Sequence, residues 1–335
     1  MHLKFTTGRE VLFLILITYI YIIYMPELPE VTTTVNGLNK VLPGLRFTDV
    51  WTDLAKKNQP IKHFQGTIKD ENFFKEFRKK IVGKKVLSVE RRAKNILINV
   101  SGGYTILIHL KMTGHLLYGK YIKKIVGRKI VWEPKDSKSP LIDPYNRFIH
   151  FVFCLSNGKY LAFCDSRKFG KITFFETKNM GNTIHLKNIG PEPLEEKTDL
   201  SLFKDRLNLK PRGKIKTVLM DQSVIVGIGN IYSDEMLWLS GIHPESIVSK
   251  IPNKELGLLY KNMKIVLKKG INFGGDSMSD YRNIDGERGG FQHHHNVYRL
   301  NKTTCKKKDC DGGIIRKVVN GRSAHFCNKH QKLFN

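Results

Sequence analysis

Apolar residues along this chain change from helical spacing to strand-like runs and back again. Four apolar positions from Val31 to Leu42 keep the spacing of one helix face up to the stop signal Pro43-Gly44. Short apolar runs separated by turn residues follow, and they predict strands at 86–89, 96–100, 104–110, 148–155, 160–164 and 171–175. Several short strands at this spacing predict a sandwich or barrel-like β domain.

The second half of the chain returns to helical spacing after a connector that contains Pro191 and Pro193. Apolar helix faces are predicted within 202–207, 215–220, 231–239 and 256–267. Residues 120–140 are rich in lysine and poor in large apolar groups, so we expect a long, solvated, inserted loop there. The pattern as a whole predicts an α+β protein with a β-rich first half and a helical second half.

Residues 1–24 raise the question of where the protein begins. An apolar run from Val11 to Tyr24 follows Lys4 and Arg9, but it is short for a membrane span and has no small-residue cleavage site. Its isoleucine and tyrosine content also matches translated AT-rich non-coding DNA. The segment is therefore either an over-extended start, which we favour, or an anchor or targeting segment. If the protein begins after Met25, Pro26 has a free secondary amine.

The charge of the chain points to a polyanionic partner. The formal net charge is +27, and the lysines and arginines are spread along the chain. Nucleic acid is the usual partner of so basic a protein, although a merely cationic enzyme is the alternative. A hydrophobic content of 41% argues for a folded body and against a ribosomal or histone-like protein. The odd number of cysteines, five, argues for a reducing compartment and against a disulfide framework.

Four residues near the C-terminus have the spacing of a metal site. Cys305, Cys310, Cys327 and His330 form the pattern C-x4-C-x16-C-x2-H, which suits structural, tetrahedral zinc. His325 is the alternative fourth ligand. Cys154 and Cys164 lie in strand-like runs and are expected in the core, and residues 293–295, three consecutive histidines, are expected at the surface.

Between the two ligand pairs, Asn320-Gly321 is the preferred two-residue turn of a type I′ hairpin, flanked by strands at 314–319 and 322–326. Arg322 follows the turn and is expected at its tip, either inserted into a DNA minor groove or solvated. Farther upstream, Val226–Asn230 holds two glycines but no third one, so a dinucleotide fingerprint is disfavoured. We expect this turn to offer backbone N–H groups to a phosphate, with Asn230 as a further donor.

Together these features resemble the formamidopyrimidine-DNA glycosylase/endonuclease VIII family of base-excision repair enzymes. The resemblance covers residues 26–330 and rests on MPELPEV at 25–31, RRAKN at 91–95, HLKMTG at 109–114, DSRKFG at 165–170, LMDQSVIVGIGNIYSDE at 219–235 and the terminal finger. It implies an N-terminal two-sheet β-sandwich with flanking helices and a C-terminal helix–two-turn–helix domain with a β-hairpin zinc finger. The implied division is an extension (1–24), a catalytic β-sandwich domain (26–193), a linker (194–199), a helix–two-turn–helix domain (200–296) and a zinc finger (297–335).

The resemblance also implies roles for individual residues. Pro26 matches the nucleophile that attacks C1′ of the damaged nucleotide, Glu27 matches the acid/base, and Glu30 matches a supporting acid. Lys94 matches a lysine that contacts the lesion phosphate and helps catalysis. The residues that fill the void left by a flipped base would be Met112, Arg167 and Phe169, and further phosphate contacts would be Lys216, Asn230 and Arg322.

These implications predict a monomeric DNA glycosylase and AP lyase that removes oxidised purines from double-stranded DNA and carries one zinc ion. The cytoplasm, in association with the nucleoid, is its expected location, with no membrane contact unless residues 1–24 are a real anchor. An endonuclease VIII-like enzyme for oxidised pyrimidines is one alternative. A damage-binding protein without catalysis is another if the extension is retained. Departures from the family pattern include Lys111, where many relatives have glycine, and His330 in place of a cysteine.

Overall fold

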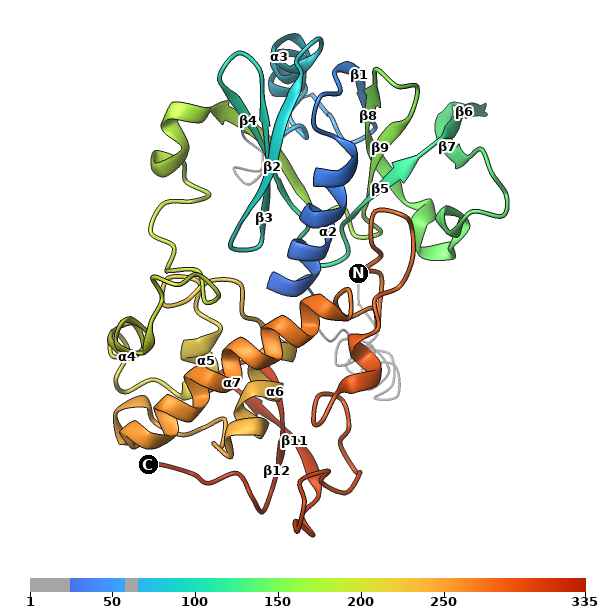
Figure 1. The fold of residues 1–335 in the computed structure, drawn as a ribbon. Coiled ribbons are helices and arrows are strands. Elements are labelled where there is room, and N and C mark those ends of the chain that lie inside the picture. The colour runs from blue at the N-terminus through green and yellow to red at the C-terminus, as the bar shows by residue number, and fades with distance from the viewer. Residues whose placement is uncertain (1–24, 58–65) are drawn as a thin grey trace, which may run out of the picture.

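The computed structural model describes residues 25–57 and 66–335, so the extension at 1–24 lies outside the described residues. Figure 1 shows a β-rich upper half, a helical lower half and the helix α2 (Leu28–Val41) between them. In the part of the chain that is described, no helix combines the length and the apolar character needed to cross a membrane.

The upper half is a sandwich of two four-stranded antiparallel sheets, as the sequence predicts. The strands in sheet order are β1 (Phe47–Thr52), β8 (Ile149–Leu155), β9 (Tyr160–Cys164) and β5 (His115–Gly119) in the first sheet, and β10 (Lys171–Glu176), β4 (Tyr104–His109), β3 (Asn95–Val100) and β2 (Val86–Arg92) in the second. Phenylalanines fill much of the space between the sheets. Phe77 of α3 (Glu71–Ile81) is buried among them with its ring centroid 5.8 Å from that of Phe151, so α3 belongs to the same core.

The prediction of a loop at 120–140 is wrong. Tyr121–Val126 (β6) and Lys129–Pro134 (β7) pair as an antiparallel hairpin. Its lysines face solvent while Trp132 is buried, with its ring 5.1 Å from that of Tyr160. Most side chains of this hairpin are exposed, and its lysine content made it resemble a loop. Short 3-10 helices lie at Pro140–Ile142, Pro144–Arg147, Thr177–Asn182, Val248–Lys250 and Phe291–His294.

The lower half contains the predicted helices α4 (Leu200–Leu207), α5 (Ile215–Leu219), α6 (Asn230–Ser240) and α7 (Asn253–Asn272). Their apolar faces form one core, which Leu28 joins, whereas Val31 and Leu38 of the same helix α2 lie in the core of the sandwich. Helix α2 therefore belongs to both halves, and its first turn is held at the junction between them.

The C-terminal hairpin is formed by β11 (Ile314–Val319) and β12 (Arg322–Cys327). Its turn residues Asn320 and Gly321 have φ angles of 46° and 75°, which confirms the predicted turn with two left-handed residues. The expectation that all of 293–295 lies at the surface is wrong for His295. Its ring is buried, with Nε2 2.6 Å from a carboxylate oxygen of Asp276, which local sequence could not predict.

Candidate active site

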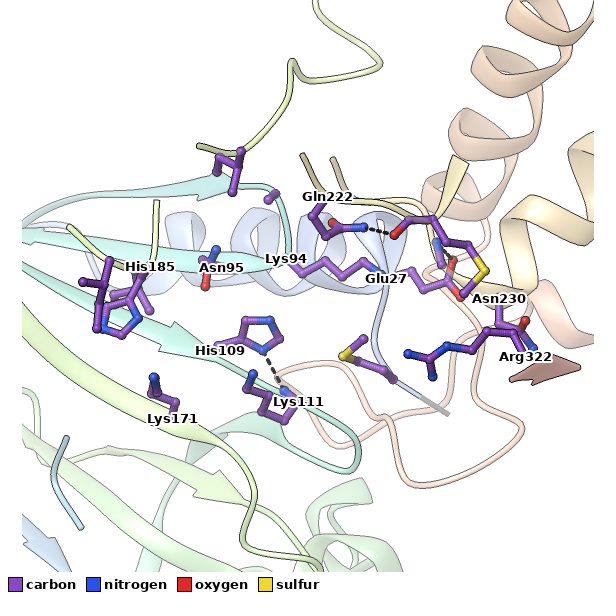
Figure 2. A pocket seen from close by; sticks show the side chains of 17 residues that line it. Glu27, Lys94, Asn95, His109, Lys111, Lys171, His185, Gln222, Asn230 and Arg322 are labelled. Atoms are coloured by element: carbon purple, nitrogen blue, oxygen red, sulfur yellow. Dashed lines mark hydrogen bonds between the residues drawn. The ribbon is translucent and has the colours of Figure 1, made fainter. Parts of the chain in front are cut away.

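A cavity of about 450 Å³ lies where the two halves meet. Met25, Glu27 and Lys94 line it from the sandwich side, and Asn230 and Arg322 line it from the helical half and the hairpin. Figure 2 shows Glu27 and Lys94 near one another, with Asn230 and Arg322 at one end of the group. The cavity thus brings together residues that the sequence separates by up to 297 positions, from Met25 to Arg322.

Glu27 is held by the glycine turn before α6. Its two carboxylate oxygens accept hydrogen bonds from the N–H groups of Gly229 at 2.7 Å, Ile231 at 2.9 Å and Tyr232 at 3.4 Å. We expected these donors to bind a phosphate, and the structure corrects this: the anion is the protein's own carboxylate. A Cβ atom at Gly229 would lie 2.4 Å from the Glu27 carboxyl carbon, so this close approach requires glycine.

Glu30 lies directly behind Glu27 and is fully buried. Its carboxyl oxygens accept hydrogen bonds from the Glu27 N–H at 2.7 Å, the Tyr232 hydroxyl at 2.6 Å and the Asp276 N–H at 2.7 Å. Burial raises the pKa of both glutamates, and that of Glu30 reaches about 8 because the Glu27 carboxyl adds repulsion. The pair therefore retains a proton at neutral pH more readily than exposed carboxyls would.

Lys94 enters the cavity from the turn between β2 and β3. The turn is fixed by Glu192, which pairs with the guanidinium groups of Arg91 at 2.6 Å and Arg92 at 3.0 Å and accepts the Ala93 N–H at 2.6 Å. Burial lowers the pKa of Lys94, while the nearby Glu27 opposes this shift. The result is a buried amine, that of Lys94, near the buried carboxyl of Glu27 at the N-terminal end of α2.

Comparison with known proteins agrees with this geometry. The family model described as the formamidopyrimidine-DNA glycosylase N-terminal domain matches residues 25–172, and the model of the H2TH domain of the same enzyme matches residues 189–282. The chain belongs to the formamidopyrimidine-DNA glycosylase family. Membership makes it a DNA glycosylase of base-excision repair.

Individual relatives support the assignment along nearly the whole chain. The formamidopyrimidine-DNA glycosylase of Pelotomaculum thermopropionicum is 36% identical over 311 residues, covering 92% of this chain and all of the relative. The Bacillus subtilis enzyme of the same name is 33% identical over 310 residues, covering 92% of this chain and 99% of the relative. The fold is similar to that of Lactococcus lactis Fpg in complex with DNA containing an abasic site, with a TM-score of 0.74, 27% identity and coverage of 91% and 99%.

His109 also lines the cavity, and we did not single it out from the sequence. Burial and the neighbouring Lys111 lower its pKa to about 3, so the ring is neutral at pH 7. Its Nδ1 accepts the Lys111 N–H at 3.0 Å, which places the ring proton on Nε2. His109 thus adds a neutral donor to the cavity lining. The HLKMTG motif contains this histidine, but burial at the cavity edge could not be read from it.

The expected void-filling residues come from two loops that the structure brings together. Asp165 accepts a hydrogen bond from Thr113 and the Arg167 N–H at 3.2 Å, joining the loop after β4 to the loop before β10. Phe169 is 50% exposed, with the Arg167 guanidinium 4.9 Å from its ring, and Met112 is half-buried. Phe169 is thus not a core residue. These three side chains do not line the cavity among the residues described, and their roles stay predictions.

Lys216 is not among the described residues that line the cavity. It is fully buried and its ammonium group pairs with Asp234, whose other oxygen accepts the His325 N–H at 2.9 Å. The same ammonium lies 3.4 Å from the backbone oxygen of Asn230, whose side-chain amide donates to the Ser323 hydroxyl at 3.2 Å. Lys216 therefore supports the start of α6 and its link to the hairpin, and direct contact with a phosphate stays a prediction.

The predicted metal ligands form a cluster. One ligand atom from each of Cys305, Cys310, Cys327 and His330 lies within 4.8 Å of the others. The Nε2 atom of His330 is 3.0 Å from the Trp238 carbonyl oxygen, so this nitrogen donates and Nδ1 faces the sulfurs. Three sulfurs and one oriented imidazole fit a tetrahedral metal ion such as zinc. His325 is instead bound to Asp234, which excludes it from this cluster.

Proposed function

We propose that this glycosylase removes oxidised purines from duplex DNA and then cleaves the strand at the resulting abasic site. The observation that carries the proposal is the position of Glu27. A buried carboxyl with a raised pKa, held by three N–H groups, stands in the cavity directly after Pro26. The relatives' name and the DNA complexes of Lactococcus lactis Fpg support damaged DNA as the partner.

The proposed chemistry uses the amine of Pro26 and the carboxyl of Glu27, which are neighbours in the chain. The Pro26 nitrogen attacks C1′ of the damaged nucleotide, and the bond from C1′ to the base breaks. The base leaves with the bonding electron pair and takes up the proton that the proline nitrogen loses. Glu27 donates a proton to the sugar ring oxygen, and the ring opens to an iminium ion between Pro26 and C1′. Loss of a proton from C2′ expels the 3′ phosphate, and a second elimination expels the 5′ phosphate. Glu30 holds the Glu27 backbone in place through its hydrogen bond.

The remaining predicted residues bind the DNA in this proposal. Lys94, Asn230 and Arg322 line the cavity and bind phosphates around the lesion. The void left by the flipped base is filled from the two joined loops by Met112, Arg167 and Phe169. The duplex binds between two units. One is the catalytic sandwich at 26–193, and the other is the DNA-binding unit at 200–296 with its finger at 297–335.

Borohydride trapping tests the proposal. Protein that begins at Pro26 and carries zinc is incubated with a duplex that contains 8-oxoguanine opposite cytosine, and sodium borohydride reduces the iminium to a stable amine. We expect a covalent protein–DNA band with the lesion duplex and none with undamaged duplex. Absence of that band, while the protein still binds the duplex, would refute the mechanism. Duplexes with oxidised pyrimidines, run alongside, measure the preference between the two lesion classes.

The Cys/His cluster holds zinc in our proposal, and metal removal should abolish tight DNA binding. Without the ion the ligands lose their common centre, so the hairpin that carries Arg322 loses its fixed position. Loss of this charge-assisted contact alone corresponds to about 10- to 150-fold in affinity, from roughly 1.5–3 kcal/mol. Cys327→Ser should reproduce the loss after chelation, and Cys154→Ser in β8 is the matched control. Unchanged affinity and unfolding temperature in metal-free protein would contradict the assignment.

A further inference from the structure

The cavity continues along the sandwich beyond Lys94 and ends at two lysines and two histidines. Lys111, Lys171, His109 and His185 line this part, at the end away from Arg322 (Figure 2). The site described above does not use Lys111 or Lys171.

Strand pairing places the two lysines together. Lys171 begins β10 and is directly opposite His109, the last residue of β4, and Lys111 follows two positions later. Within the part of the chain that is described, neither lysine forms an ion pair, and Glu27 is the sole acidic residue of the cavity lining. Burial and the charge of Lys111 lower the pKa of Lys171, so the two ammonium groups repel each other in the absence of an anion.

The backbone of Lys111 adds an independent argument. Its φ angle of 57° lies in the left-handed region, which glycine adopts without the clash of a side chain. Glycine would adopt this φ angle without strain, so the backbone does not need a lysine at this position. A strained residue whose long cation points into a cavity is instead typical of a binding role.

We propose that Lys111 and Lys171 form an additional phosphate-binding site that holds the damaged strand at a backbone phosphate beyond the one bound by Lys94. The ligand is a phosphodiester, because a single anion between two ammonium groups removes their repulsion and two lysines bind it as point charges. This inference rests on the proposed function, since it assumes that a DNA strand occupies the cavity.

The first experiment measures salt-dependent binding. Lys111→Gly, Lys171→Gln and the double variant are compared with wild type on a duplex containing tetrahydrofuran, a stable abasic analogue. The slope of log affinity against log salt should fall by about 0.9 in the double variant, the value for one phosphate contact. Lys75→Ala, which removes one charge from α3, should leave the slope unchanged. Lys111→Gly should unfold at the wild-type temperature or higher, because glycine relieves the backbone strain.

The second experiment locates the phosphate. Single uncharged methylphosphonate linkages are moved along the damaged strand, and one position should weaken the wild type about tenfold but leave the double variant unaffected. If the double variant has the slope of Lys75→Ala, or responds like wild type at every position, the additional site does not exist. Borohydride trapping by the wild type, measured in parallel, reports separately on the proposed function.

Discussion

Protein that retains residues 1–24 is expected to bind damaged duplex but to form no borohydride-trapped complex. Inside a longer chain the Pro26 nitrogen is a tertiary amide without a nucleophilic lone pair, so it cannot form an iminium with C1′. The phosphate-binding residues are unaffected, and binding should persist with the steep salt dependence of a basic protein. Trapping and affinity, measured on the same sample with the 8-oxoguanine duplex, separate the two effects.

A single retained residue provides the matched control. Protein that begins at Met25 blocks the same nitrogen without the bulk of the extension, and it should also fail to trap. Trapping by either blocked form would identify another amine as the nucleophile. Lys94 is the candidate, because burial lowers its pKa inside the same cavity, and Lys94→Ala in the blocked form would then remove the trapped band. The intact mass of the protein isolated from its own cells shows which form is made.

Local sequence was sufficient to predict an element where apolar runs recur between turn residues, or where a turn requires particular residue types. Strands β2, β3, β4, β8, β9 and β10 follow apolar runs between turn residues, and Asn320-Gly321 specifies its own turn, so these were predictable, whereas β5, β6 and β7 were not predicted. Short elements with mixed composition were missed, among them β1 (Phe47–Thr52) and α3 (Glu71–Ile81). Of the residues that the family motifs single out, the structure brings Glu27, Lys94, Asn230 and Arg322 together at the cavity, and their roles stay predictions.

What sequence could not predict are contacts that depend on distant partners. The N–H groups of the glycine turn bind Glu27, more than 200 positions earlier, and no local pattern distinguishes this carboxylate from a phosphate. His295 looks like a surface residue until Asp276 is found beside it. Lys216 likewise looks like a free cation, although it is buried and paired with Asp234. In each case burial decides the role, and burial is a property of the assembled fold.

Glu27→Gln is expected to separate base removal from strand cleavage. Without an acid to protonate the sugar ring oxygen, excision of 8-oxoguanine should slow by about 100- to 10,000-fold, the usual contribution of a general acid. Cleavage at a preformed abasic site should persist, because its base is already gone and its sugar opens to an aldehyde without help. Glycosylase rates and abasic-site trapping, measured on the same preparation, test this separation, and the trapping also shows that the variant is folded.

The pH dependence gives a second readout. Because burial raises the pKa of Glu27, its protonated fraction at pH 7 exceeds that of an exposed glutamate and falls as pH rises. Wild-type glycosylase activity should therefore decline on the alkaline side, while deprotonation of the Pro26 amine limits it on the acidic side. The alkaline decline should be absent in Glu27→Gln. Equal loss of both activities, with the alkaline decline retained, would mean that Glu27 only holds the glycine turn in place and that another group is the acid.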